Sequence, residues 1–254
     1  MIDGIAIYVL WLREMKRFLR AKSRVVGTLT LPLLFLAFLG FGFNNMAIPG
    51  MSKNVDYINF LVPGIIGMSM LFTSMFAGIS VLWDREFGFL KEIMVAPVSR
   101  ISIVLGRIAG GTTTAAIQGI LILFISVIMG FKIPGVLSFL LSVVFMVLIS
   151  TTFIGLGFIF ASNMKDTQGF SMIINFVMFP LFFLSGALFP LQNLPVWIRY
   201  ISYLDPLTYG VDGLRGILVG VSSFPIILNF IILAGSSLTM VLLGAYSFEK
   251  SDVV

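Results

Sequence analysis

Long uninterrupted hydrophobic runs dominate the chain, and polar residues gather in the short segments between them. A helix needs about 20 apolar residues to cross the roughly 30 Å hydrocarbon core of a bilayer. The runs are continuous and do not alternate between polar and apolar positions, which favours membrane helices over barrel strands. The expected fold is therefore an all-α polytopic membrane protein, with residues 1–254 forming one transmembrane domain. The six expected spans are residues 25–43, 59–83, 101–130, 136–161, 170–189 and 225–246.

The segment before the first run, residues 5–24, has the periodicity of an amphipathic helix, with apolar side chains on one side and charged side chains on the other. A basic polar face combined with a Trp on the apolar face is typical of a helix lying in the membrane interface. The pattern fits a membrane-surface anchor or a helix that also packs against a partner protein. The apolar stripe is Tyr8, Trp11, Leu12, Met15, Phe18 and Leu19, and the charged face is Arg13, Glu14, Lys16, Arg17 and Arg20.

The composition agrees with a protein whose main solvent is lipid. Hydrophobic residues make up 59 % of the chain and charged residues 11 %, whereas soluble domains have roughly 45–50 % and about 25 %. The sequence has no Cys and no His, which excludes disulfides, thiolate nucleophiles, Cys/His metal sites and imidazole bases. We therefore expect no catalytic residue and no metal site. The net charge of +5 is explained better by membrane topology than by a nucleic-acid partner.

The basic residues are distributed unequally between the two sides of the membrane. Six spans place both termini on one side, which carries twelve of the Lys and Arg residues, against four on the other side. Because cytoplasmic loops are enriched in Lys and Arg, both termini are expected in the cytoplasm. The twelve are Arg13, Lys16, Arg17, Arg20, Lys22, Arg24, Arg85, Lys91, Arg100, Arg107, Lys165 and Lys250, and the four are Lys53, Lys132, Arg199 and Arg215.

Few polar side chains lie within the expected spans. Arg107 stands near one end of the third span, Gln118 near its middle and Asn175 in the fifth. Ion-driven transporters usually need ionisable groups at mid-depth, so the pattern weighs against an ATP-independent channel or secondary transporter, which is the alternative function. A membrane enzyme is disfavoured because no paired carboxylates lie inside the spans. Gln118 and Asn175 fit helix–helix hydrogen bonding, the commoner role, or ligand contact.

The segment between the second and third spans, residues 84–100, is rich in charge, with the sequence DREFGFLKEIMVAPVSR. Apolar residues at three- and four-residue spacing predict a short helix with one apolar stripe. Pro97 ends this helix, and Ser99 caps the next span. The segment fits a solvated connector resting on the bilayer or a docking element for a groove on another protein. The stripe is Phe87, Leu90 and Met94.

Together with Trp83, this segment resembles the E-x-G-T-L-E-x-L-x-x-x-P-x-S-R loop of the ABC-2 type transporter permeases, with Phe89 where the family commonly has Thr. A second stretch, Phe182 to Gly220, contains SGALFPLQNLP and is similar to the family's SG-x-x-FP-x-x-x-LP signature. Within the family the chain is most similar to daunorubicin-resistance-type multidrug exporters and nodulation lipo-oligosaccharide exporters. The first likeness is carried by Glu86, Gly88, Leu90, Glu92, Pro97, Ser99 and Arg100.

The resemblance implies that the charged segment is a coupling helix seated in a cleft of an ABC ATPase subunit. The chain lacks the G-x-x-x-x-G-K-[ST] phosphate-binding motif, so ATP and Mg²⁺ would be used by that separate subunit and this chain would bind no cofactor. The resemblance also implies two ATPase copies, a homodimer of this chain, and export across the cytoplasmic membrane. The residues expected at the ATPase contact are Asp84, Arg85, Glu86, Phe87, Gly88, Leu90, Glu92, Pro97 and Arg100.

The resemblance further implies that the second and fifth spans line the pathway at the dimer interface. Met and Phe side chains suit a hydrophobic or amphipathic passenger, such as a drug, a lipid or a lipid-linked glycan. Plain packing is the commoner role of such side chains. The expected pathway residues are Phe72, Met75, Phe76, Asn175, Phe179 and Phe183.

Prolines and glycines interrupt the chain after the fifth run, in the outer region 190–223. Such breaks predict that residues 194–204 dip back into the membrane, or that they form an ordinary loop with a surface helix. The resemblance favours the first reading, a re-entrant outer gate. Asp212 and Arg215 are expected to form an i,i+3 pair with a structural role. The expected gate residues are Pro190, Leu194, Pro195 and Trp197.

Overall fold

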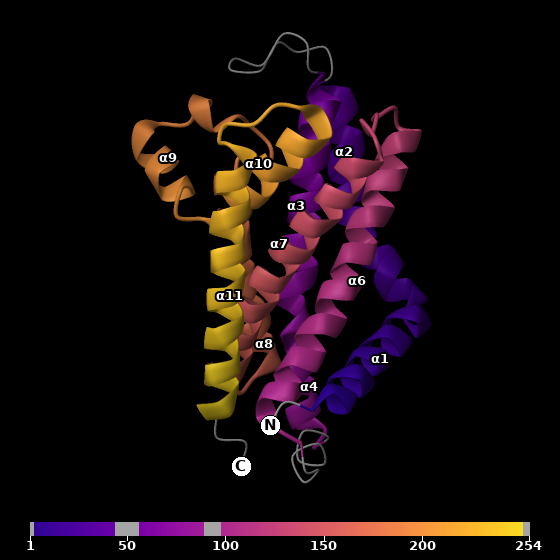
Figure 1. Cartoon of the computed structure of the whole chain (residues 1–254), viewed down its shortest axis with the longest axis vertical. Helices are drawn as coiled ribbons and strands as arrows, with labels where there is room; N and C mark the ends of the chain where they lie inside the picture. Colours follow the sequence, from indigo (N-terminus) through magenta and orange to yellow (C-terminus); the bar gives the residue numbers. More distant parts are fainter. Residues whose placement is uncertain (1–2, 44–55, 89–97, 251–254) are drawn as a thin grey trace.

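The computed structural model describes residues 3–43, 56–88 and 98–250, which form a bundle of helices (Figure 1). No strand occurs in these residues, and the predicted all-α class is confirmed. The elements are α1 Gly4–Arg20, α2 Lys22–Gly42, α3 Tyr57–Ala77, α4 Ile79–Glu86, α6 Arg100–Ile128, α7 Val136–Asn163, α8 Thr167–Leu184, the 3₁₀ turn η1 Leu191–Asn193, α9 Val196–Ser202, α10 Pro206–Val219 and α11 Ile226–Lys250.

Six segments of the described chain are long and apolar enough to cross a membrane, as the hydrophobic runs predict. They lie in α2, in α3 continued through α4, and in α6, α7, α8 and α11. The fifth span ends at Leu184, earlier than expected. The reason is local: the helix stops at Ser185, and Gly186 has a φ of +72°, a backbone conformation that favours glycine.

α3 is the central helix of the bundle. Of its spanning stretch, 72 % is buried inside the protein, compared with 17 % for α2 and for α11. α3 packs against α2, α6, α7, α8 and α10. The outer faces of α2, α8 and α11 expose large apolar side chains such as Phe38, Phe176 and Ile227. Such surfaces are suited to contact with lipid or with another membrane helix.

Glycines allow the central helices to approach each other backbone to backbone. A Cβ atom on Gly78, between α3 and α4, would lie 2.6 Å from the carbonyl oxygen of Gly157 in α7. A Cβ atom on Gly157 would lie 2.7 Å from the carbonyl oxygen of Met75. Small residues at helix crossings are common in membranes, because lipid provides no hydrophobic force between helices and close packing must hold them together.

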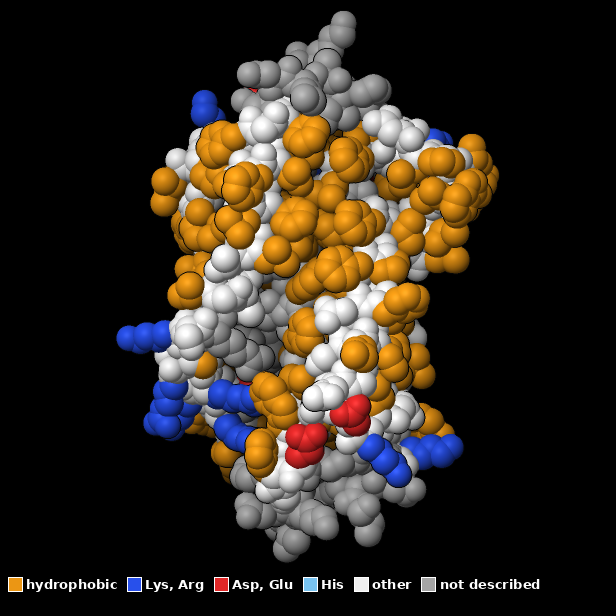
Figure 2. Space-filling view, turned by 180° about the vertical axis from the view of Figure 1, so that it is seen from behind, with side chains coloured by type: hydrophobic (Ala, Val, Ile, Leu, Met, Phe, Trp, Pro, Cys, Tyr) orange, Lys and Arg blue, Asp and Glu red, His pale blue; other side chains and the backbone are white. Residues whose placement is uncertain are grey.

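The two ends of the bundle differ in chemistry. The α1 end, formed by α1, α4 and the last turn of α11, lies at the bottom of Figure 1, and the α10 end, formed by α9 and α10, lies at the top. Figure 2 shows Lys and Arg side chains gathered towards the α1 end, below a broad hydrophobic band. α1 is a helix, as expected, and ends at Arg20. Its position in a membrane interface stays a prediction.

Candidate functional site

A buried charge cluster joins three helices at the α1 end. The Asp84 carboxylate of α4 accepts hydrogen bonds from Arg107 of α6, with Nη2 2.5 Å from Oδ2, and from Arg13 of α1, with Nη2 2.9 Å from Oδ1. Asp84 and Arg107 are only 6 % and 4 % exposed. Burial of a charge is costly unless the charge is paired. The cluster therefore holds α1, α4 and α6 in fixed positions relative to one another.

The connector between the second and third spans begins later than the sequence predicts. α4, which includes Arg85, continues through Asp84 to Glu86. Asp84, expected at the ATPase contact, is buried, and arginines use both of its carboxylate oxygens; its place at the ATPase contact stays a prediction. Glu86 and Phe87 are exposed, and Gly88 has a φ of +73°. The other residues expected at the ATPase contact in this segment lie outside the described residues: Leu90, Glu92 and Pro97.

The first turn of α6, which follows the connector, is anchored by contacts with two distant helices. Ser99 caps α6, as predicted, by accepting a hydrogen bond of 3.2 Å from the Ser102 amide. The Asp3 amide, just before α1, donates to Ser102 Oγ over 2.8 Å. Arg100, expected at the ATPase contact, donates over 2.6 Å to the carbonyl oxygen of Glu249 near the end of α11. The connector therefore leads directly into the junction of α1, α6 and α11.

α1 packs along α6, and its apolar stripe is divided between the protein and the surroundings. Trp11 Nε1 donates a hydrogen bond of 3.1 Å to Thr113 Oγ1 of α6, and Met15 is buried. Tyr8 and Leu19 remain 57 % and 69 % exposed. Only part of the stripe is thus available to a membrane surface.

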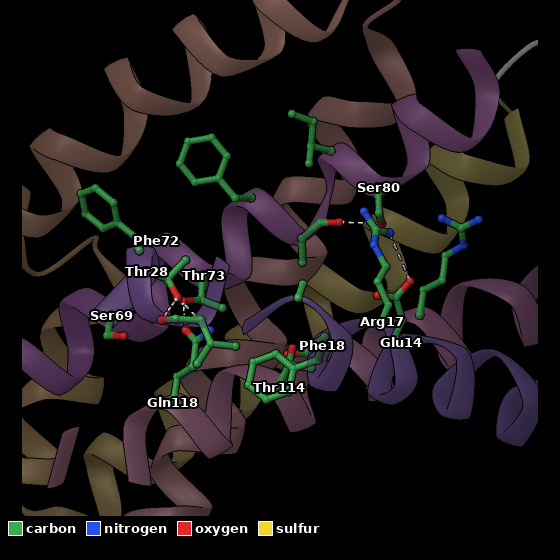
Figure 3. Close-up of a pocket in the computed structure, with 18 of the residues that line it drawn as sticks. Glu14, Arg17, Phe18, Thr28, Ser69, Phe72, Thr73, Ser80, Thr114 and Gln118 are labelled. Carbon is green, nitrogen blue, oxygen red and sulfur yellow. Dashed lines mark hydrogen bonds and ion pairs between the residues drawn. The ribbon is translucent and has the colours of Figure 1, made fainter. Parts of the chain in front are cut away.

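A cavity of about 430 Å³ lies between α1, α2, α3, α4 and α6, with Phe158 of α7 also on its wall (Figure 3). Its walls are mostly apolar, but they include charged groups and several hydroxyl groups. The charged residues are Glu14, Arg17 and Arg107; the hydroxyl and amide residues are Thr28, Ser69, Thr73, Ser80, Thr114 and Gln118; the large apolar residues include Phe18, Leu31, Met68, Phe72, Phe76, Trp83 and Phe158.

Gln118, in the middle of the third span, links three helices at the wall of this cavity. Its Oε1 accepts a hydrogen bond of 2.6 Å from Thr73 Oγ1 of α3, and its Nε2 donates over 3.1 Å to Thr28 Oγ1 of α2. This confirms the expected role in helix–helix hydrogen bonding. Figure 3 shows this trio at one end of the cavity and Glu14 and Arg17 at the other.

Three of the residues expected to line a pathway lie along the contact between α3 and α8. Phe72 of α3 packs edge to face on Phe179 of α8, with 5.6 Å between ring centroids. Phe179 and Phe183 remain 44 % and 57 % exposed on the outer surface of the chain. The structure therefore brings the second and fifth spans together at an aromatic contact. The rings contributed by the fifth span remain partly exposed on the surface of the chain.

The other expected pathway residues lie elsewhere. Met75 is completely buried, and Phe76 lines the cavity at the α1 end. Asn175 Nδ2 donates over 2.9 Å to the Ser171 carbonyl oxygen, one turn back in its own helix. This hydrogen bond therefore stays within α8.

At the α10 end, an arginine holds the irregular backbone that follows α8. Arg215 of α10 donates from Nη2 to the Gly186 carbonyl oxygen over 3.0 Å and from Nε to the Phe60 carbonyl oxygen over 3.3 Å. Its guanidinium carbon also lies 3.7 Å from the centroid of the Phe60 ring. Arg215 thereby ties α3, α10 and the segment after α8 together.

The same segment is buried against α3. Tyr57 Oη donates to the Leu188 carbonyl oxygen over 3.2 Å, and any side chain on Gly64 would collide with the Ala187 carbonyl. Irregular backbone at membrane depth is tolerated where protein buries it, and this segment meets that condition. A re-entrant path through the membrane stays a prediction.

Asp212 does not form the expected ion pair with Arg215 in the described structure. Its carboxylate instead accepts hydrogen bonds from the Ser223 and Phe224 amides, over 2.7 and 3.0 Å, and from Asn229 Nδ2, over 2.9 Å. The expected contact is wrong because these closer donors surround the carboxylate. Asp212 still has a structural role, since it fixes the turn from α10 into α11.

Asp205 caps α10 and is almost completely buried. Its Oδ1 accepts a hydrogen bond of 2.9 Å from the Leu207 amide, whereas its Oδ2 is buried without a hydrogen-bond partner. Burial raises the pKa of Asp205 to about 8, and the Leu207 amide opposes this shift only in part.

The expected gate residues lie at the α10 end in different environments. Pro190 is buried, Leu194 is half-buried, Pro195 is exposed, and Trp197 in α9 is 66 % exposed. Arg199 Nη2 donates over 2.7 Å to the Gln192 carbonyl oxygen and so attaches α9 to η1. A gating role for these residues stays a prediction.

The bundle of membrane-spanning helices, with a charged cluster at one end and a buried irregular segment at the other, defines a multi-pass membrane protein. Comparison with known proteins gives its family: residues 5–219 match the ABC-2 type transporter family, and the chain belongs to it.

Relatives of this chain are transport permeases. It is 29 % identical over 234 residues to the inner membrane transport permease YadH of Escherichia coli K12, covering 89 % of this chain and 88 % of YadH. It is 32 % identical over 201 residues to the putative transport permease ycf38 of Porphyra purpurea, covering 77 % of this chain and 68 % of ycf38. It is 30 % identical over 180 residues to the probable multidrug ABC transporter permease YbhR of E. coli K12, covering 70 % of this chain and 48 % of YbhR. The chain is therefore a transport permease.

Proposed function

We propose that this chain is the membrane-spanning subunit of an ATP-driven exporter and acts as a homodimer with two copies of a separate ABC ATPase subunit. ATP and Mg²⁺ are used by that subunit. Membership of the ABC-2 type transporter family supports the proposal, as does the likeness to YbhR, a probable multidrug ABC transporter permease. The sequence has no G-x-x-x-x-G-K-[ST] motif, which supports placing ATP binding on another chain.

The α1 end faces the cytoplasm in this proposal. Twelve of the sixteen Lys and Arg residues belong to the side that carries both termini, and cytoplasmic segments are enriched in such residues. α4 ends at this end of the bundle, and the exposed Phe87 that follows it is accessible to a cytoplasmic ATPase.

The Asp84 cluster is the observation that carries the proposal. The ATPase contacts the connector, where Glu86 and Phe87 are exposed. Asp84, two residues before Glu86, is bonded to Arg107 of α6 and Arg13 of α1. A push on the connector therefore moves α1, α4 and α6 as one rigid unit.

The passenger is a hydrophobic or amphipathic molecule that moves outward beside the contact between α3 and α8. The exposed aromatic face of α8 lies against the second copy of the chain, and the passenger passes between Phe72, Phe179 and Phe183 of both copies. The outer gate at the α10 end contains Pro190, Leu194, Pro195 and Trp197.

Co-expression with an ABC ATPase subunit and reconstitution in vesicles tests the proposal. The complex should bind the ATPase and hydrolyse ATP faster when amphipathic compounds are added. Replacement of Glu86 and Glu92 together by Arg should prevent co-purification of the ATPase, whereas Glu249→Arg, an exposed charge reversal at the same end, should not. Normal co-purification by the double variant would contradict the coupling role. Transport by the purified chain without ATP would contradict the ATP-driven mechanism.

A further inference from the structure

The cavity at the α1 end contains buried donors that no described residue satisfies. Arg107 is 4 % exposed and lines the cavity. Its Nη2 bonds to Asp84, but its Nε and Nη1 have no hydrogen-bond partner. Ser69 Oγ, also on the wall, is buried and unpaired. Buried polar groups without partners are costly and usually indicate a ligand or bound water.

The charge balance at this end of the cavity favours an anion. Arg17 and Arg107 line it, and Glu14 is the acidic residue among the described lining residues. Glu14 is already 3.8 Å from Arg17. Asp84, just behind the wall, is shared by Arg13 and Arg107. Among the cavity-lining residues that the structure describes, two arginines accompany one acidic residue, and Arg107 Nε and Nη1 keep N–H groups that an anion could accept.

The rest of the cavity suits an apolar tail. Phe18, Leu31, Phe72 and Phe76 form its walls. Of the polar groups at its far end, Thr28, Thr73 and Gln118 are hydrogen-bonded to each other, and Ser69 adds one small hydroxyl group. They therefore compete little for a ligand. A volume of about 430 Å³ lies within the roughly 300–1,000 Å³ range of small-molecule sites.

We propose that this cavity binds one anionic amphiphile drawn from the membrane, with its phosphate or carboxylate head at Arg17 and Arg107 and its tail along Phe72 and Phe76. Figure 3 shows the required order of groups, with Glu14 and Arg17 at one end and Phe72 towards the other. The site belongs to a single chain and involves no residue of α8. It shares Phe72 with the proposed pathway, but binding to the isolated chain requires neither the ATPase nor ATP.

Native mass spectrometry of the full chain in the neutral detergent dodecyl maltoside tests this site, with dodecyl phosphate as the probe. The wild-type protein should retain one equivalent. Arg17→Gln should weaken binding about tenfold, which corresponds to one charge-assisted hydrogen bond. Arg20→Gln is the matched control, because it removes the same charge from α1 at a position outside this cavity.

A second variant tests whether the apolar tail of the ligand lies in the cavity. Gly27 lines the cavity, and a side chain added there meets no atom within 4 Å. Gly27→Phe should therefore reduce retention of dodecyl phosphate without disturbing the fold. Gly235→Phe, on α11, is its control, since Gly235 also has open space around it.

Three results would overturn the proposal. One is equal loss of binding in Arg17→Gln and Arg20→Gln, which would indicate attraction to the basic surface only. Another is no effect of Gly27→Phe beyond that of its control. The third is displacement of dodecyl phosphate by inorganic phosphate that is itself retained, because the ligand would then be a soluble anion.

Discussion

Arg107 of α6 and Asp84 of α4 form a buried ion pair, with Nη2 2.5 Å from Oδ2. Arg13 of α1 completes the cluster, and its side chain is one-third exposed. The pair stands where the second and third spans meet the connector. The cluster links α1, α4 and α6, so a force applied to one of these helices at this end is transmitted to the other two.

Removal of one member of this pair should destabilise the protein. Arg107→Met leaves the Asp84 carboxylate buried with Arg13 alone, and loss of one partner of a buried pair costs about 3–5 kcal/mol. The double variant Asp84→Leu with Arg107→Met should lose much less, because neither buried charge of the pair is then present. Thermal unfolding of the wild type, Asp84→Leu, Arg107→Met and the double variant in detergent measures the coupling between the two residues. Additive losses would show that the pair does not act as a unit.

Arg215 should be required for order in the segment after α8. Arg215→Lys keeps the charge but loses the planar group that contacts both the Gly186 carbonyl and the Phe60 ring, so this exchange is not conservative. We expect faster hydrogen exchange at residues 185–191 in Arg215→Lys. Exchange rates equal to those of the wild type would show that the Tyr57 contact alone holds the segment.

Asp205 should make stability dependent on pH. Its pKa is raised by burial from 3.8 to about 8, so the folded state holds a proton that the unfolded state releases. Stability should therefore be highest below pH 4, decrease as pH rises from about 4 to about 8, and stay constant above that range. Asp205→Asn can still cap α10 and should flatten this part of the profile. An unchanged slope would assign the pH dependence to another group.

The contact between Gly78 and Gly157 should tolerate no side chain. Gly78→Ala places a methyl group 2.6 Å from the Gly157 carbonyl oxygen, which must separate α4 from α7. We expect a lower unfolding temperature for Gly78→Ala. Gly235→Ala, whose added atom meets nothing within 4 Å, should be neutral or slightly stabilising because Ala favours helix. Equal stability of both variants would contradict close packing at this crossing.

The sequence was sufficient to predict the number and approximate positions of the spans, because a helix in lipid must be continuously apolar over its length. It was not sufficient for the pairing of Asp84 with Arg107, since these residues belong to different helices and only packing brings them together. A signal was present: Arg107 is the single charge in a long apolar run, and such a charge needs a partner. The Arg215 contact with Gly186 depends likewise on packing between distant segments. The cavity could not be predicted, because residues of six helices line it.

The proposed coupling can be tested most directly by photo-cross-linking from the connector to the ATPase. Phe87 is 82 % exposed next to α4, and Trp197 is 66 % exposed at the opposite end. Benzoylphenylalanine at either position replaces one aromatic side chain with another. Irradiation of the complex with the ATPase should cross-link position 87 to the ATPase subunit and leave position 197 without such a product. Absence of a cross-link from position 87 in a complex that contains the ATPase, or cross-linking from position 197 instead, would contradict the proposed function.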